Sequence, residues 1–255
     1  MSILDQVDAA IVLNDEERLL VEQVQALSRE HLAPRAAGFD ASGEFPWDNV
    51  RDINALGLNA MFVPADYEGA PLSYTAYLLC VREISAACAA TGIIWATNFH
   101  GMKPVIDFGA EALKRKVLPQ VAGGALGALC ITEPSAGSDA TGMRTRFEPD
   151  GDAVIVNGGK TFITNAGPSD FYLVFGKWSA IDDPRKAITA LIVEKDTPGL
   201  SVGEPEKKLG IRASRTGPLY FDNCRVPREN LLGEPGEGLR IFCGVLDETA
   251  SAATV

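Results

Sequence analysis

The stretch Leu129-Cys-Ile-Thr-Glu-Pro-Ser-Ala-Gly-Ser-Asp139 marks the point where the chain changes from helical to strand character. Its apolar start predicts a strand, and Pro134 ends that strand because proline has no N–H for a sheet ladder. Residues 135–139 then offer two hydroxyl groups, free backbone N–H groups and a glycine that lets another molecule come close. These groups suit the polar edge of a ring or a phosphate, but an ordinary β-turn without a ligand is an equally good interpretation of this stretch alone.

A second strand pattern, Lys160-Thr-Phe-Ile-Thr-Asn165, also ends in hydroxyl and amide side chains. Together with the first stretch it resembles the flavin-binding signature of the acyl-CoA dehydrogenase family. The resemblance continues in Lys208-Leu-Gly-Ile-Arg-Ala-Ser-Arg-Thr216 and in Phe221-Asp-Asn-Cys-Arg-Val-Pro227, so it runs in order through nearly the whole chain. It implies a flavoprotein that carries FAD.

The resemblance also implies roles for individual residues. Thr132 and Thr164 would hydrogen-bond the polar edge of the flavin, and Ser138 would meet the pyrophosphate and border the pantetheine arm of the substrate. Phe162 stands where many family members carry a tryptophan against the ring, whereas without the resemblance it is best interpreted as a strand residue facing the core. Strand alternation places Thr161 on the opposite face from Thr164. The implied FAD contacts are Leu129, Cys130, Ile131, Thr132, Ser138, Phe162, Ile163 and Thr164.

The implied reaction is the α,β-dehydrogenation of an acyl-CoA thioester, with electrons passed to an electron-transfer flavoprotein. In most members the catalytic glutamate lies in a C-terminal helical bundle, beyond the position of Val255, so we expect a truncated, oligomeric member that is weak or inactive alone. Glu248 is a conceivable base, although a solvated helix carboxylate is the commoner interpretation. Asp247 matches a substrate-contacting aspartate, while Ala250 replaces the family's arginine. The alternative is a non-catalytic flavin- or acyl-CoA-binding subunit, or a fragment, that needs a partner chain for the base.

Composition excludes several other classes of protein. The formal net charge of −11 and the pI near 4.7 argue against a nucleic-acid partner, which requires a basic surface. No apolar run approaches the roughly 18–20 residues of a membrane span. Residues 1–8 are acidic where a signal peptide would be basic, so the cytoplasm is the expected compartment.

The sequence predicts neither a metal site nor a disulfide framework. His31 and His100 lack ligand spacing with carboxylates or cysteines, and no C-x-x-C pair occurs. Residues 158–161 read Gly-Gly-Lys-Thr, like the end of a phosphate-binding P-loop, but Val154 occupies the position of the required glycine. The scattered cysteines are expected to be reduced and mostly buried; they are Cys80, Cys88, Cys130, Cys224 and Cys243.

The predicted fold is α+β. Residues 1–124 form an N-terminal helical domain, residues 125–234 an antiparallel β-barrel or sandwich, and residues 235–255 the start of a C-terminal helix. Asn14 and Glu17 predict a capping box for a helix that ends at Pro34. Further helices are expected to begin at Pro46 and to span 72–90, 93–99 and 111–120. The Gly158-Gly159 pair is interpreted as a turn between two short strands.

Overall fold

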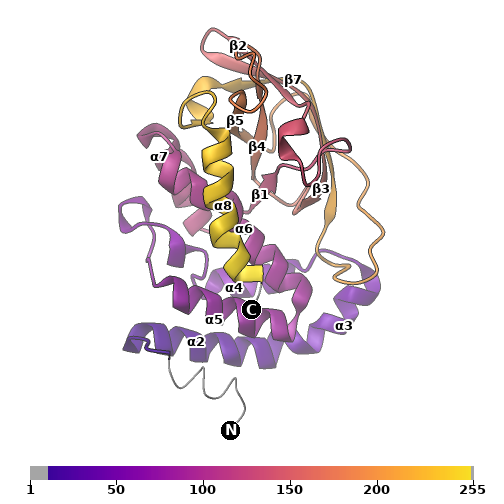
Figure 1. The fold of residues 1–255 in the computed structure, drawn as a ribbon. Coiled ribbons are helices and arrows are strands. Elements are labelled where there is room, and N and C mark those ends of the chain that lie inside the picture. Colours follow the sequence, from indigo (N-terminus) through magenta and orange to yellow (C-terminus); the bar gives the residue numbers. More distant parts are fainter. Residues whose placement is uncertain (1–10, 254–255) are drawn as a thin grey trace.

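The computed structural model describes residues 11–253, with side chains as far as Val245. A layer of helices lies against a curved sheet, and the last helix runs along both (Figure 1). The longer helices are α2 (Asp15–Leu27), α3 (Ala33–Ser42), α4 (Trp47–Ala55), α5 (Tyr74–Ala87), α6 (Ala89–Phe108), α7 (Glu111–Ala122) and α8 (Gly238–Ala253). Short helical turns are η1 (Ser28–Leu32), η2 (Ala60–Phe62), η3 (Ala65–Tyr67), η4 (Ala140–Gly142) and η5 (Arg228–Asn230).

The first helix begins as the sequence predicts but does not end there. The Asn14 side chain accepts a hydrogen bond from Glu17 N at 2.9 Å, and the Glu17 carboxylate accepts one from Asn14 N at 3.1 Å, so the capping box is confirmed. The predicted end at Pro34 is wrong. A π-helical turn, η1, joins α2 to α3, and Pro34 lies in the first turn of α3, where its missing N–H costs no hydrogen bond.

Helix α6 is longer than its prediction. The apolar run 93–99 lies inside a helix that continues through Pro104 to Phe108. Every residue of this run is buried except Ile93, which is 41% exposed. The predicted helix 72–90 corresponds to α5, which Ser73 caps by accepting a hydrogen bond from Ala76 N. Within residues 11–253, no helix combines the length and the apolar character that a membrane crossing requires.

The strands form one mixed sheet in the order β6-β7-β3-β2-β4-β5-β8, with β1 paired to β4. The α+β class is therefore confirmed. A closed barrel is wrong, because the path ends at β6 and β8, and an all-antiparallel sheet is wrong, because β1 and β2 both run parallel to β4. The strands are β1 (Gly127–Cys130), β2 (Arg146–Asp150), β3 (Ala153–Thr164), β4 (Phe171–Trp178), β5 (Ile188–Glu194), β6 (Leu200–Val202), β7 (Thr216–Pro227) and β8 (Leu231–Leu232).

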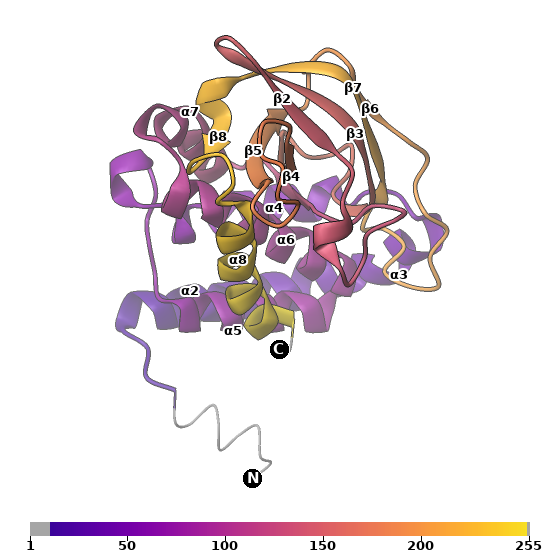
Figure 2. The same cartoon turned by 45° about the horizontal axis from the view of Figure 1, so that its top comes forward.

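The sheet is curved (Figure 2) and encloses an apolar core of its own. On β4, Tyr172 and Val174 face this inner core, which β3 and β7 cover from the other side. Leu173 and Phe175 face the opposite way, toward α6, α7 and α8. Strand β4 is thus buried on both faces, which explains its continuous apolar sequence. A third core lies among the N-terminal helices.

The predicted Gly158-Gly159 turn is wrong, since both glycines lie inside the single strand β3. Gly158 has φ of +143°, and a Cβ atom there would stand 2.7 Å from Thr145 Cα. The glycine is therefore needed for close approach of another segment, and the ladder between β3 and β7 shifts register beside it.

His100 on α6 is a half-buried histidine. Within the described part of the chain its Nε2 atom has no hydrogen-bond partner. Burial lowers the pKa of His100 to about 4, below the ordinary histidine value of about 6.5. Between these two values the unfolded chain binds a proton that the folded chain does not.

We therefore expect the free energy of unfolding to fall by about 1–2 kcal/mol on going from pH 7 to pH 5, because stability rises with pH wherever the unfolded state binds more protons. Urea unfolding of the wild type and of His100→Leu at both pH values checks this. The variant should lose less stability than the wild type. Ile93→Leu, at an exposed residue of the same helix that carries no titratable group, serves as the control and should leave the wild-type pH dependence unchanged. Equal losses in wild type and His100→Leu would contradict the assignment.

Candidate functional site

The two signature stretches lie side by side at one edge of the sheet. Thr161 N donates a hydrogen bond to Thr132 O at 2.9 Å, which joins the chain leaving β1 to the last third of β3. These residues are far apart along the sequence. The fold brings their backbones into direct contact.

The turn after β1 is compact and projects Ser138 outward. Glu133 and Ala136 exchange two backbone hydrogen bonds of 3.0 Å around Pro134. Asp139 then accepts hydrogen bonds from Thr141 N at 3.0 Å and from the Thr141 hydroxyl at 2.6 Å, which starts η4. Ser138 stands exposed between these two fixed points.

Beneath this turn lies a buried ion pair. Lys160 Nζ stands 2.7 Å from Glu133 Oε1, and the two side chains are 0% and 4% exposed. Burial opposes ionisation of Glu133, but the Lys160 charge and the hydrogen bonds to the carboxylate outweigh it and hold the pKa of Glu133 below its ordinary value. Burial lowers the pKa of Lys160, an effect that the Glu133 charge partly offsets.

Phe162 does not face the core. Its side chain is 62% exposed, and its φ of +58° lies in the left-handed region that non-glycine residues rarely adopt. A register shift between Lys160 and Ile163 inserts one extra residue into β3 at this point. The interpretation as a core residue is therefore excluded, and a strained backbone presents a flat apolar ring to the outside.

The same bulge overturns one expectation about the threonines. Lys160 and Ile163, three residues apart, are both buried and pair with Leu219 and Gly217 of β7. Because of the extra residue, simple alternation fails, and Thr161 and Thr164 are both half-buried on the other face. Within residues 11–253, the Thr164 hydroxyl forms no hydrogen bond, so it is available to a ligand.

The remaining implied contacts fall into two groups. Cys130 and Ile163 are 0% and 2% exposed, with side chains in the inner core of the sheet, so only their backbones can meet a ligand. Leu129 and Ile131 are half-buried toward the helices, and Thr132 is half-buried beside them. The candidate site therefore combines half-buried apolar surface, two threonine hydroxyls and the Phe162 ring. This combination of apolar and hydrogen-bonding groups fits a flavin.

Asn165 holds the helical layer against this edge of the sheet. Its Nδ2 atom donates to Ile94 O of α6 at 3.0 Å and to Gly127 O of β1 at 3.3 Å. Helix α6 comes close to β1 at Gly101, where a Cβ atom would stand 3.0 Å from Ala128 N. The site edge is therefore positioned by both layers of the fold.

A cationic pocket opens near the same turn. Its volume is about 310 Å³, and the cations that line it are Arg144, Arg146 and Lys177, beside Trp178. The hydrogen bonds from Thr141 hold the pKa of Asp139 below its ordinary value, and the charges of Arg185 and Lys177 add to this lowering. Arg144, which lines the pocket, lies five residues after Asp139 along the chain. Asp182 also lines the pocket, and Arg146 is paired with Glu148 at 2.9 Å, so Arg144 and Lys177 are the cations suited to phosphate groups.

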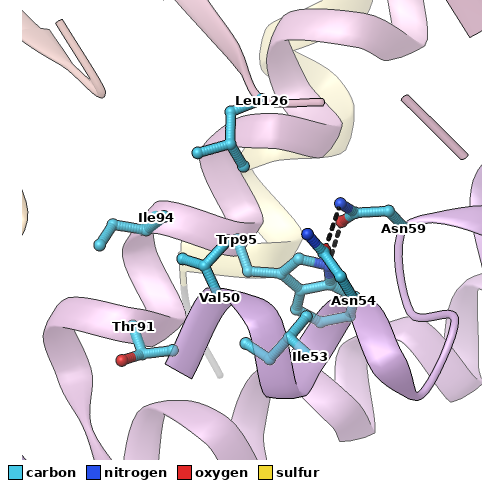
Figure 3. A pocket seen from close by; sticks show the side chains of 8 residues that line it. All are labelled: Val50, Ile53, Asn54, Asn59, Thr91, Ile94, Trp95 and Leu126. Carbon is cyan, nitrogen blue, oxygen red and sulfur yellow. Dashed lines mark hydrogen bonds between the residues drawn. The ribbon is translucent and has the colours of Figure 1, made fainter. Parts of the chain in front are cut away.

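A second cavity lies inside the helical layer, between α4 and α6 (Figure 3). Its volume is about 10 Å³, room for about one water molecule, so it is too small for a cofactor. Asn59 closes one side by accepting from Trp95 Nε1 at 3.0 Å and donating to Asn54 Oδ1 at 2.8 Å. Among the residues that the structure describes, no group of three potential metal ligands occurs.

Two family models match the chain. The model of the acyl-CoA dehydrogenase N-terminal domain matches residues 14–125, and that of the middle domain matches residues 128–224. The chain belongs to the acyl-CoA dehydrogenase family. The boundary between the two models falls where α7 gives way to β1, in keeping with the change of pattern in the sequence.

Individual proteins agree with this family membership. The chain is 41% identical over 241 residues to a probable acyl-CoA dehydrogenase, fadE25, of Mycobacterium leprae, covering 93% of this chain and 61% of that protein. It therefore spans about three fifths of this relative's length. Butyryl-CoA dehydrogenase from Megasphaera elsdenii matches with a TM-score of 0.90 and 32% identity, over 95% of this chain and 66% of that one. An acyl-CoA dehydrogenase complexed with FAD from Bacillus anthracis matches with a TM-score of 0.84 and 31% identity, over 93% and 40%.

For this acyl-CoA dehydrogenase family member, sequence analysis did not assign a role to Glu133 or Lys160, which support the candidate site. It did assign possible roles to Asp247 and Glu248. The backbones of Asp247 and Glu248 belong to α8, but their side chains lie outside the described residues. Glu133 and Lys160 were given no role, although both stand in the quoted stretches. A lysine in the middle of a strand that is otherwise apolar was the available signal, since buried lysine requires a partner.

Proposed function

We propose that this chain binds FAD and an acyl-CoA thioester and serves α,β-dehydrogenation of the thioester. The observation that carries the proposal is the bulge that turns Phe162 outward beside the half-buried hydroxyl of Thr164, at the edge where both signature stretches meet. FAD, where bound, supplies the acceptor for the substrate's β-hydride. Two of the matched structures, a butyryl-CoA dehydrogenase and an acyl-CoA dehydrogenase complexed with FAD, support the same assignment.

In this proposal the chain's own residues bind and orient the flavin and the acyl-CoA substrate. Thr132 and Thr164 hydrogen-bond the polar edge of the flavin, Phe162 packs against its ring, and the backbone of residues 129–131 and 163 lies along it. Ser138 meets the pyrophosphate and the pantetheine arm. Asp247 contacts the substrate, and the general base is a carboxylate whose position stays open, with Glu248 as one candidate.

The substrate carries phosphates, and the cationic pocket lined by Arg144 and Lys177 offers them a complementary charge. An electron-transfer flavoprotein is the proposed acceptor of the electrons, and an oligomer is the proposed working form. The division into domains at residues 1–124, 125–234 and 235–255 and the cytoplasmic location stay predictions.

The visible absorption spectrum of the purified chain tests flavin binding. Retained or titratable FAD is expected, and a chain that binds no FAD would reject the proposal. Dye reduction with a panel of acyl-CoAs then separates the two functions that the sequence allows. Turnover supports a dehydrogenase, whereas binding of both ligands without turnover favours a subunit that needs a partner for the base.

Thr164→Val is expected to weaken FAD binding about fivefold, because a lost hydrogen bond costs about 1 kcal/mol. Fluorescence titration of FAD measures this. Thr197→Val is the control, since Thr197 is also half-buried but lies in the turn before β6. The first residue of β6, Leu200, pairs with Phe221 and not with the end of β7 that pairs with Thr164. Equal effects of the two changes would count against the role of Thr164.

Ser138→Leu is expected to weaken the binding of FAD and acyl-CoA together, each by about tenfold, or about 1.4 kcal/mol. The branched side chain would fill space that the turn leaves open for the pyrophosphate and pantetheine. Ser201→Leu, at an exposed serine of β6 outside both stretches, should leave both affinities near those of the wild type. Calorimetry that finds undiminished binding of both ligands to Ser138→Leu would reject this role.

A further inference from the structure

The Glu133–Lys160 pair connects three segments of the chain. Besides its 2.7 Å contact with Glu133 Oε1, Lys160 Nζ donates to Ile131 O at 2.9 Å. Glu133 Oε2 accepts from Arg144 N at 2.6 Å, and Oε1 accepts from Thr145 N at 3.0 Å. One buried pair thus holds the end of β1, the start of the β2 segment and the middle of β3.

Each of these contacts fixes the backbone close to a residue that faces the candidate flavin site. Glu133 directly follows Thr132, and its carboxylate closes the base of the loop 134–143, which carries Ser138. Lys160 stands two residues before Phe162, at the point where the extra residue enters β3. The pair therefore lies next to three of the side chains expected to touch the cofactor, namely Thr132, Ser138 and Phe162.

Stability alone does not account for a charged pair in this position. Removing two ions from water carries a desolvation penalty, and apolar residues of similar volume often stabilise a protein equally well or better. An apolar pair at positions 133 and 160 could not accept the N–H groups of Arg144 and Thr145, nor donate to Ile131 O. What the ion pair adds is a defined geometry for the three segments.

We propose that Glu133 and Lys160 are positioning residues that set the mutual placement of the two flavin-binding stretches. This inference rests on the proposed flavin function and deepens it. Neither side chain touches the cofactor, since both are buried beneath the turn. They act through Thr132, Ser138 and Phe162.

The test uses the full 255-residue chain and the double variant Glu133→Leu/Lys160→Met. Because the variant leaves the N–H groups of Arg144 and Thr145 without their acceptor, we expect its thermal unfolding temperature to fall. Its affinity for FAD per folded molecule, measured below that temperature, should fall by more than tenfold. Hydrogen exchange at the amides of Arg144, Thr145 and Thr161, measured without FAD, should accelerate by more than tenfold. A merely structural pair would change unfolding and leave FAD affinity per folded molecule unaltered.

The matched control is Glu194→Leu/Lys116→Met, which removes a 2.6 Å pair of the same residue types between α7 and β5, with side chains 39% and 36% exposed. It should change neither FAD affinity nor exchange at the three amides. If the double variant at positions 133 and 160 does not fold, Glu133→Gln, which keeps the shape and one acceptor oxygen, takes its place with the same expected changes.

Two failures are distinguishable. A wild-type chain that binds no FAD rejects the proposed function, and the exchange measurement then still decides whether the pair holds the three segments together. Wild-type exchange rates in the double variant, or in Glu133→Gln where that is used, overturn the positioning role. Undiminished FAD affinity in a variant whose wild type binds FAD overturns it as well.

Discussion

Lys160→Met alone is expected to lower the free energy of unfolding by about 3–5 kcal/mol. The change keeps most of the side-chain volume but leaves the Glu133 side chain, which is 4% exposed, buried without its cation. An uncompensated buried charge either remains at high cost or takes up a proton, and a protonated carboxyl can no longer accept both backbone N–H groups equally well. Urea unfolding at neutral pH measures the loss.

Lys116→Met provides the comparison, because its partner Glu194 is 39% exposed and a surface pair contributes about 0–1 kcal/mol. Similar losses for the two variants would contradict the assignment of a buried pair at Lys160.

The pH dependence of the same variant follows from the sign of the Glu133 shift. The folded-state pKa of Glu133 is lowered, so its contribution to stability is fully present above the unfolded value of about 4.3 and is lost as pH falls through the folded value. In Lys160→Met the charge that lowers the folded-state pKa of Glu133 is absent. The difference in stability between wild type and Lys160→Met should therefore shrink as the pH is brought below about 4.

Local sequence signals predicted the parts of the fold that short-range physics determines. The capping box at Asn14 and Glu17 forms as expected, because both partners lie within one helical turn. The change from helix to strand near residue 125 was likewise predicted. Pro34 was misinterpreted because proline is compatible with the first turn of a new helix, and a π-helical turn before it lets the chain continue.

The errors in the sheet have a different cause, since they concern contacts between distant segments. Nothing near β1 or β2 in the sequence states that both pair in parallel with β4. The bulge at Phe162 depends on the ladder with β7, whose pairing partner is more than fifty residues away along the chain. Strand alternation consequently failed for Thr161. The family signature nevertheless identified the segments of the site. Its residue types are those that several contacts between distant segments require at the same time.

Gly158→Ala is expected to cost about 3–5 kcal/mol of stability, through two effects that add. The backbone has φ of +143°, which side chains other than glycine rarely adopt, and the new Cβ atom would meet Thr145 Cα and Oγ1 at 2.7 Å. The close neighbour is backbone, so it cannot turn away as a flexible side chain could. To relieve the contact, Thr145 has to move, and its N–H would then leave the Glu133 carboxylate.

Gly151→Ala separates the two effects. Gly151 has φ of +62° in the turn between β2 and β3, and a Cβ atom there has no neighbour within 4 Å, so this variant carries backbone strain alone, about 1 kcal/mol. Urea unfolding compares the two variants, and FAD titration adds a second readout. Because displacement of Thr145 loosens the base of the loop that carries Ser138, Gly158→Ala should also weaken FAD binding, whereas Gly151→Ala should not. Equal stability losses in the two variants would show that the approach of Thr145 to β3 contributes nothing beyond the strained backbone.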